Sequence, residues 1–250
     1  MAAAVRWAGS RWRAQLLLYL GAYWAYSATR WIAVGEVPKA TAHAHWIAGL
    51  EQSLHVSVER SVQQALDSGA PIWLLNHLYL IAQFLVVPGA LVWLYWRSRP
   101  VYRQLRNTVL ATWLIAVPIY ALFPVAPPRL AGIGIADTIS GQSAADLNSH
   151  LATSFYNPFA AVPSLHVGFA FAVGIALAAA LHRRWAKALA LLWGPAVTLA
   201  VVATGNHFVF DAVAGLLVTA AGFLAGRWAG RVWVSARAAV PAVWRARTAS

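Results

Sequence analysis

Residues 161–166, AVPSLH, begin the stretch that decides the fold, because an apolar run free of acidic and basic residues follows them as far as Leu181. Residues 205–211, GNHFVFD, open a second apolar run in the same way. An ionisable group beside a membrane-length apolar run is costly unless it has a partner or a function. The two stretches therefore predict a membrane protein whose chemistry lies at the surface, where its helices begin.

The composition places the chain in the membrane class. Of its 250 residues 60% are hydrophobic and 10% are charged, whereas a soluble domain has about 25% charged residues. A helix needs about 20 mostly apolar residues to cross the hydrocarbon. Six stretches approach that length: residues 14–33, 71–93, 108–123, 164–181, 188–204 and 208–228. We therefore expect an all-α fold, a six-transmembrane-helix bundle formed by residues 1–250 as a single domain without internal repeats.

The charges are divided between the two ends of the expected spans. Most of the 19 basic residues lie before the first span, between the second and third, between the fourth and fifth, or after the sixth. All seven acidic residues lie on the other side or at its membrane boundary. The positive-inside rule then places both termini in the cytoplasm and the opposite face outside, which we expect to be the outer face of a bacterial plasma membrane. Basic charge split in this way does not form the contiguous surface that nucleic acid requires.

The first span has a second interpretation. Its preceding arginines, its apolar core from Leu16 and the small residues Ser27 and Ala28 also resemble a signal peptide. Cleavage there would leave the orientation of the other five spans unchanged. The chain has no cysteine, which excludes disulfides and thiol catalysis.

Two outer segments interrupt the spans. In residues 35–69 the apolar side chains Trp46, Leu50, Leu54 and Val58 recur at four-residue spacing, which predicts a helix along the interface, packed on its own protein or docked on the membrane. Residues 124–162 are rich in Pro, Gly and Ser and should be largely irregular. Because this second segment leads into residues 163–166, we expect it to cap the site.

Glycines repeat every four residues in the last span, at Gly222, Gly226 and Gly230. Such spacing permits close helix contact. It is compatible with packing inside one molecule and with a homodimer seam, so the oligomeric state stays open.

The candidate chemistry lies at the starts of two spans. His207 and Asp211 are four residues apart and share a helix face, so the carboxylate can fix the tautomer of the ring and leave its other nitrogen as a nucleophile. His166 follows a Pro-Ser start signal, where free backbone N–H groups suit a phosphate and Ser164 adds a hydroxyl donor. The expected topology brings both starts and the loop that carries Arg129 to one outer face.

Three motifs in this order resemble a known family. They are residues 123–130 (FPVAPPRL), 157–166 (NPFAAVPSLH) and 204–207 (TGNH) with Asp211. The pattern is similar to that of the type 2 phosphatidic acid phosphatase superfamily, and in particular to its branch that includes inositol phosphorylceramide synthases. The resemblance covers the chain from residue 123 onward, with the catalytic motifs within residues 123–215.

The resemblance implies a membrane lipid phosphatase or phosphotransferase that acts on a lipid phosphate or phospholipid at the outer leaflet. His207 would attack phosphorus to form a phosphohistidine, Asp211 would orient it, and His166 would protonate the leaving oxygen. Arg129 and Ser164 would bind the phosphoryl oxygens. No metal and no cofactor is implied, and the acceptor would be water or an alcohol.

The sequence departs from the superfamily pattern at two positions. Leu122 and Val201 stand where basic residues are expected. A site with fewer cations should favour a singly charged phosphodiester over a monoester. Arg30, Arg60 or Lys39 are the candidates to replace the missing charge.

Other interpretations of these residues remain. His166 alone is compatible with a bond between helices, Arg129 with an interfacial anchor, and the three catalytic candidates with a zinc site. Asn76 and His77 are expected either to contact a head group or to face the bundle, and Asp137, Tyr156 and Asn157 either to shape the pocket or to pack the loop. A non-enzymatic lipid transporter or scaffold that kept the fold is the rival function. It is disfavoured because transporters usually place polar groups near mid-bilayer in matched halves.

Overall fold

The computed structural model describes residues 16, 17, 19–21, 24, 25, 27, 28, 36–66, 68–142 and 157–239. Within these residues it is all-helical, with no strand and one isolated parallel bridge between Val125 and Ala160. The elements in chain order are α2 (Val37–Ser53), α3 (Glu59–Leu66), α4 (Ala70–Ile81), the π-helical segment η1 (Ala82–Val86), α5 (Val87–Arg97), α6 (Arg99–Leu122), the 3₁₀ turn η2 (Pro128–Leu130), α7 (Thr138–Gln142), α9 (Leu165–Ala180), α10 (Arg184–Ala203) and α11 (Val209–Ala239).

Four helices are long and apolar enough to cross a membrane. They are the continuous unit Ala70–Arg97, then Arg99–Leu122, Arg184–Ala203 and Val209–Arg231. They match four of the expected spans, so the protein is an integral membrane protein. The expected span at residues 164–181 is the 16-residue α9, which at about 1.5 Å per residue is shorter than a full crossing. The expected span at residues 14–33 lies mostly outside the described residues, and the six-span count stays a prediction.

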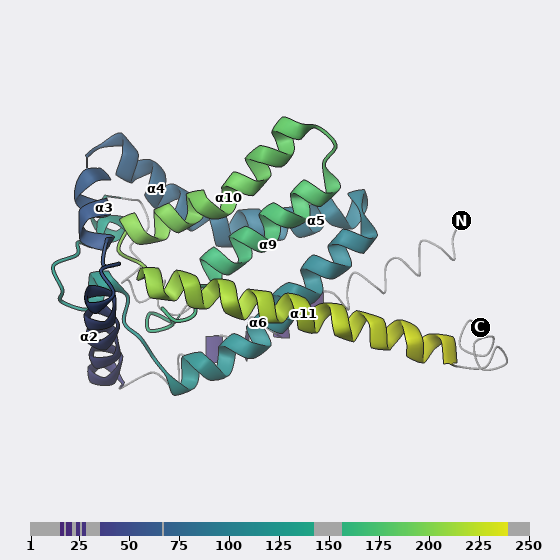
Figure 1. The fold of residues 1–250 in the computed structure, drawn as a ribbon, viewed down its shortest axis with the longest axis horizontal. Helices are drawn as coiled ribbons and strands as arrows, with labels where there is room; N and C mark the ends of the chain where they lie inside the picture. Colours follow the sequence, from purple (N-terminus) through teal and green to yellow (C-terminus); the bar gives the residue numbers. More distant parts are fainter. Residues whose placement is uncertain are drawn as a thin grey trace.

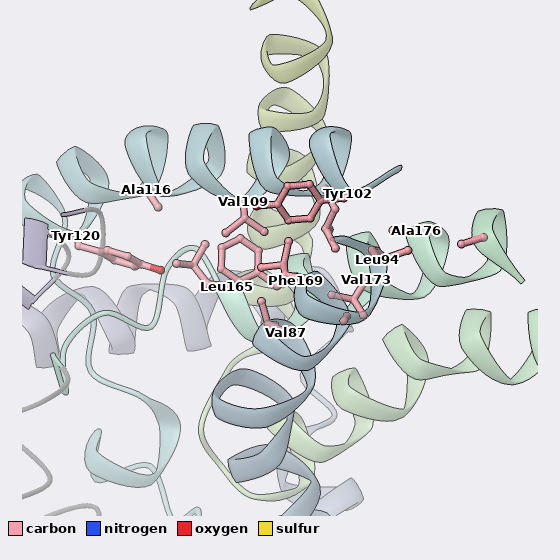
Figure 2. Close-up of a cluster of buried hydrophobic side chains, with 14 residues drawn as sticks. Val87, Leu94, Tyr102, Val109, Ala116, Tyr120, Leu165, Phe169, Val173 and Ala176 are labelled. Carbon is pink, nitrogen blue, oxygen red and sulfur yellow. The ribbon is translucent and has the colours of Figure 1, made fainter. Parts of the chain in front are cut away.

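The helix α9 lies among the other helices of the bundle. It packs against α5, α6, α10 and α11, and Figure 2 shows Phe169 of α9 between Val109 of α6 and Val87 of α5. Phe169 is fully buried, and α9 is apolar all round, as a central helix should be. The bundle is therefore built around the helix that begins with the AVPSLH stretch.

The glycines of α11 pack inside the molecule. In Figure 1, α11 runs beside α6. A Cβ added at Gly222 would collide with Thr112, and one added at Gly226 would lie 2.9 Å from the Cβ of Asn107, both residues of α6. The expectation of close helix contact is confirmed, with α6 as the partner.

The outer segment 35–69 forms two helices at one end of the bundle (Figure 1). The predicted helix is α2, but it ends at Ser53, so Leu54 and Val58 lie outside it. Its buried face carries Ala44, Ile47 and Glu51, which shows that α2 packs on its own protein. The buried stripe is Ala40, Ala44, Ile47 and Glu51, in which two alanines allow a close approach, whereas the bulky Trp46 is 57% exposed.

The segment 124–162 is largely irregular where it is described, as expected, apart from η2 and α7. The amide of Val125 donates to the carbonyl of Phe159 at 2.8 Å, and the side chain of His43 in α2 bonds the Pro124 carbonyl at 2.7 Å. The first bond joins two parts of the segment, and the second holds the segment against α2. Residues 143–156, including the pocket candidate Tyr156, lie outside the described residues.

Candidate active site

His207 lies in the turn between α10 and α11. Gly205 takes a positive φ of 68°, which favours glycine. The chain then folds back, so that the amides of Asn206 and His207 donate to the Val201 carbonyl at 3.0 and 3.1 Å. This turn sets His207 two residues before the first residue of α11, Val209.

Asp211 holds the His207 ring. One carboxylate oxygen, Oδ2, lies 3.2 Å from His207 Nδ1 and accepts the Phe208 amide at 2.9 Å. The predicted pair at four-residue spacing is therefore formed, and it leaves Nε2 of His207 as the nitrogen that does not face Asp211. Both side chains are buried, so the pair is shielded from water.

The surroundings of His207 keep its ring neutral. Burial lowers the pKa of His207 to about 3; the Ala161 carbonyl opposes this shift, and the positive charge of Arg129 adds to it. A ring with this pKa is unprotonated at neutral pH. It therefore has the lone pair that nucleophilic attack requires.

His166 occupies the first turn of α9, as predicted. Ser164 is the N-cap, and its hydroxyl oxygen accepts the Val167 amide at 3.5 Å. The Ser164 amide donates to the backbone carbonyl of Asp211 at 3.0 Å. The starts of α9 and α11 are thus joined by a backbone hydrogen bond, which brings the two histidine-bearing segments together.

The two histidine rings face the same cavity. The His166 ring lies 5.8 Å from that of His207, centroid to centroid, and stacks on Tyr79 of α4 at 4.3 Å. Nε2 of His166 is buried and has no hydrogen-bond partner within the described part of the chain. That nitrogen is therefore available for proton transfer to a molecule in the cavity.

Arg129 is fastened to the turn that carries His207. Its amide donates to the Gly205 carbonyl at 2.9 Å, its Nε donates to Asn206 Oδ1 at 3.0 Å, and its Nη1 pairs with Asp137 Oδ2 at 2.7 Å. Arg129 is 8% exposed and lines the same cavity as the histidines. Asp137 was expected either to shape the pocket or to pack the loop, and its ion pair with Arg129 helps to orient that arginine in the cavity.

The two departures from the family pattern lie away from the cavity. Leu122 is 76% exposed at the end of α6, and Val201 is fully buried in the packing of α10. Of the candidate replacements, Arg60 bonds the Ile133 carbonyl and Lys39 pairs with Glu36, while Arg30 lies outside the described residues. Arg129 is the one Arg or Lys side chain that lines the cavity among the described residues.

The cavity has a volume of about 680 Å³ and is mostly apolar. It extends from the histidines past Gln83 in η1 to Tyr95 and Trp96, near the end of α5. At about 1.5 Å per helical residue, the helical stretch from Tyr79 to Trp96 is about as long as the hydrocarbon layer is thick. The cavity along it therefore has a comparable length. Its shape and lining suit a lipid tail whose polar end lies at the histidines.

The site also contains residues that the sequence did not predict. Asn206, next to His207 in the third motif, also bonds the Thr204 hydroxyl at 2.9 Å, and its position in that motif was a usable signal. Tyr79 gave no signal, because nothing in a sequence shows which aromatic ring stacks on a histidine. Asn76 is buried and bonds Thr138, so it faces the bundle. His77 is half-buried and bonds the Trp73 carbonyl of its own helix, so its contact with a head group stays a prediction.

The zinc interpretation finds no support in the described part of the chain, where no three His, Cys, Asp or Glu side chains are grouped as metal ligands.

One family profile, described as the PAP2 superfamily, matches residues 45–225. The match includes all three motifs, together with α3, α4 and most of α2. No curated protein and no solved structure matches the chain significantly.

Proposed function

The chain belongs to the PAP2 superfamily, which makes it a phosphatase-type lipid phosphoesterase of the membrane, and on that premise we propose that it works through a phosphohistidine on His207. The observation that carries the proposal is the arrangement of one cavity. A neutral histidine held by a carboxylate, a second histidine with an unpaired nitrogen and one buried arginine meet at the end of a lipid-sized apolar channel.

In the first step, the Nε2 lone pair of His207 attacks phosphorus. The bond from phosphorus to the leaving oxygen breaks, and that oxygen takes a proton from His166, which is protonated when the negative charge of the bound phosphoester lies beside it. Asp211 stabilises the positive charge that develops on the His207 ring, and Arg129 stabilises the phosphoryl oxygens. A metal is not needed in this scheme.

In the second step, water or an alcohol attacks the phosphohistidine and gives its proton to His166. The bond between nitrogen and phosphorus breaks, and its electron pair returns to His207 Nε2. A phosphatase uses water and a transferase uses an alcohol, so the acceptor alone distinguishes the two activities.

The charge inventory favours a phosphodiester substrate. A diester carries one negative charge and a monoester nearly two, and Arg129 alone supplies full positive charge among the described cavity residues. This supports the branch of the superfamily that includes inositol phosphorylceramide synthases, in which an alcohol accepts the phosphoryl-linked head group. We expect a higher kcat/KM on a diester than on the monoester with the same tails; a strong monoester preference would contradict this assignment.

The site is proposed to face the outside of the cell. The catalytic residues lie at the starts of α9 and α11, whereas the basic residues of the α9–α10 connection lie at the other end of α9. The basic residues of the α5–α6 connection lie at the start of α6, and the loop that carries Arg129 follows the end of that helix. By the positive-inside rule those basic connections are cytoplasmic. Labelling of a single cysteine introduced at exposed Lys39 by an impermeant reagent on intact cells tests this orientation, with Arg184 as the matched cytoplasmic position.

The mechanism is tested by trapping. An H166A variant given a lipid phosphoester with a nitrophenol leaving group needs no proton for the first step but lacks the base for the second. It should accumulate a phosphohistidine at His207, visible by mass spectrometry of alkaline digests. Absence of the adduct, together with turnover by H207A, would end the proposed mechanism.

A non-enzymatic lipid transporter or scaffold is the alternative. The observation that favours this alternative is the apolar cavity, which extends along the bundle from Tyr79 to Trp96. H207A separates the two, because it should abolish turnover and leave lipid transfer between vesicle leaflets unchanged.

A further inference from the structure

The first turn of α11 is capped by carboxyl groups. A helix leaves its first N–H groups without partners inside the helix. Here the Phe208 amide donates to Asp211, as described above, but the next two amides donate to remote side chains. Val209 donates to Glu59 Oε1 at 3.0 Å and Phe210 donates to Glu51 Oε1 at 2.7 Å.

Glu51 and Glu59 come from the two outer helices. Glu51 is near the end of α2 and Glu59 is the first residue of α3. Both are 2% exposed, although an isolated buried carboxylate is strongly disfavoured. The N–H groups of α11 and the positive end of its dipole offset part of that cost.

The two glutamates also face each other. Glu51 Oε2 is buried and has no hydrogen-bond donor among the described residues. Glu51 and Glu59 accept the amides of consecutive residues, so their carboxyl groups lie close together, and contact with Glu59 is one cause of the raised pKa of Glu51. Two carboxylates have only acceptors, so a bond between them requires one proton. Burial raises the pKa of Glu51 to about 8, and Glu59 and Asp211 raise it further while the Phe210 amide opposes the shift.

We propose that Glu51 and Glu59 form a proton-sharing pair that positions the start of α11, and with it the His207–Asp211 couple. The pair acts through the backbone of Val209 and Phe210 and touches no substrate, so both are positioning residues. The inference rests on the proposed function only in taking His207 as the nucleophile. It makes α2 and α3 part of the catalytic apparatus instead of a passive outer cover.

The charged groups around the pair set the pH behaviour. Glu51 meets Glu59 from α3 and Asp211 from α11, and no basic side chain contributes to its pKa shift. Because the pKa is raised in the folded state, the stabilisation is complete below about pH 4.5 and is lost as the pH rises through about 8. Above that pH two adjacent carboxylates repel, and one bond to α11 should break.

The first experiment compares E51Q and E51A at pH 7. A glutamine keeps the oxygen that accepts the Phe210 amide and supplies an N–H to Glu59, so E51Q should retain kcat within about threefold. E51A leaves the Phe210 amide unpaired and should lower kcat by roughly ten- to a hundredfold with little change in KM, since small displacements of catalytic groups have such effects. E36Q, which removes an exposed carboxylate from the start of the same outer segment, is the matched control and should behave as wild type.

The second experiment measures kcat from pH 6 to pH 10. The wild type should lose activity with a midpoint near pH 8, and E51Q should not show that loss because the amide has no proton to release. E51Q with an unchanged alkaline loss would overturn the proposal, as would E51A with wild-type kcat.

A measurement independent of catalysis separates this inference from the proposed function. The protection of the Val209 and Phe210 amides from hydrogen exchange, taken relative to the intrinsic exchange rate at each pH, should fall in E51A and, above pH 8, in the wild type, but not in E51Q. If H207A retained turnover, the proposed mechanism would be wrong, but the expected exchange pattern would not be affected. Unchanged exchange in E51A would overturn the pairing whatever the chemistry.

Discussion

The two histidines are held by helix starts that are built differently. The start of α9 is capped from within, by the Ser164 hydroxyl that accepts the Val167 amide three residues later. The start of α11 is capped partly from outside, by Glu51 and Glu59, which precede it by about 150 residues in the sequence. His166 therefore depends on its own segment, whereas His207 depends on the outer helices as well.

The positions of the two histidines therefore depend on different parts of the fold. A local cap forms wherever its helix forms, so His166 depends on α9, on the ring of Tyr79 on which it stacks and on the backbone bond from Ser164 to Asp211. A remote cap forms only when α2 and α3 are docked. Substitutions that loosen the packing of α2 or α3 should therefore displace the nucleophile His207 more than the general acid His166.

The largest expected effect separates the roles of the two histidines. H207A removes the nucleophile and should lower kcat by roughly a thousandfold or more on every substrate. H166A removes the general acid and should cost about a hundred- to ten-thousandfold on natural leaving groups, but far less on a nitrophenyl ester, whose leaving oxygen needs no proton. Single-turnover rates of the first step on both substrate types measure this, because the second step of H166A is slow on either substrate, and equal losses of the first-step rate in H166A on both would contradict the assignment.

The same contrast explains how much the sequence revealed. The Pro-Ser signal before α9, the spacing of His207 and Asp211 and the four long apolar helices depend on residues close in sequence, and each was predictable. The stacking of Tyr79 on His166, the Asp137 partner of Arg129 and the Glu51–Glu59 cap depend on which segments pack together. No short-range pattern encodes those contacts, so they required the structure.

Arg129 offers the next test, because it is bonded to the His207 turn at Gly205 and Asn206. R129A should lower kcat/KM by roughly a hundred- to a thousandfold, since it removes the buried charge that faces the developing phosphoryl charge. R129K should recover part of this loss, because it keeps the charge but loses the fork that bonds Asn206 and Asp137. Kinetics on one phosphodiester lipid measure both.

The control for Arg129 is R60A, which removes another arginine that bonds a backbone carbonyl of the same loop but does not line the cavity. It should retain near-wild-type kcat/KM. A loss in R60A equal to that in R129A would assign the effect to loop structure and not to phosphate binding.

A glycine sets the contact between the two helix starts. A Cβ added at Gly215 of α11 would collide with the backbone of Ser164, whereas one added at Gly89 of α5 meets nothing within 4 Å. G215A should therefore lower the free energy of unfolding by about 1–3 kcal/mol and also lower kcat, because it pushes His166 away from His207. G89A should be neutral or stabilising by about 0.5–1 kcal/mol. Unfolding in detergent and kcat for the pair decide the point, and a G215A variant with wild-type stability and rate would show that the two starts tolerate separation.

The smallest expected effect tests the local cap itself. S164A should lower the free energy of unfolding by about 0.5–2 kcal/mol, and S164G by only a few tenths, because glycine is nearly as good an N-cap. S164G thus removes the hydroxyl at almost constant stability, which isolates the predicted role of Ser164 as a phosphate donor. Ser164 is fully buried and is not among the residues that line the cavity, so we expect kcat/KM of S164G to fall less than threefold. A tenfold or larger fall at unchanged stability would instead place the hydroxyl on the phosphoryl group, and α9 would then resemble α11 in joining its cap to the chemistry.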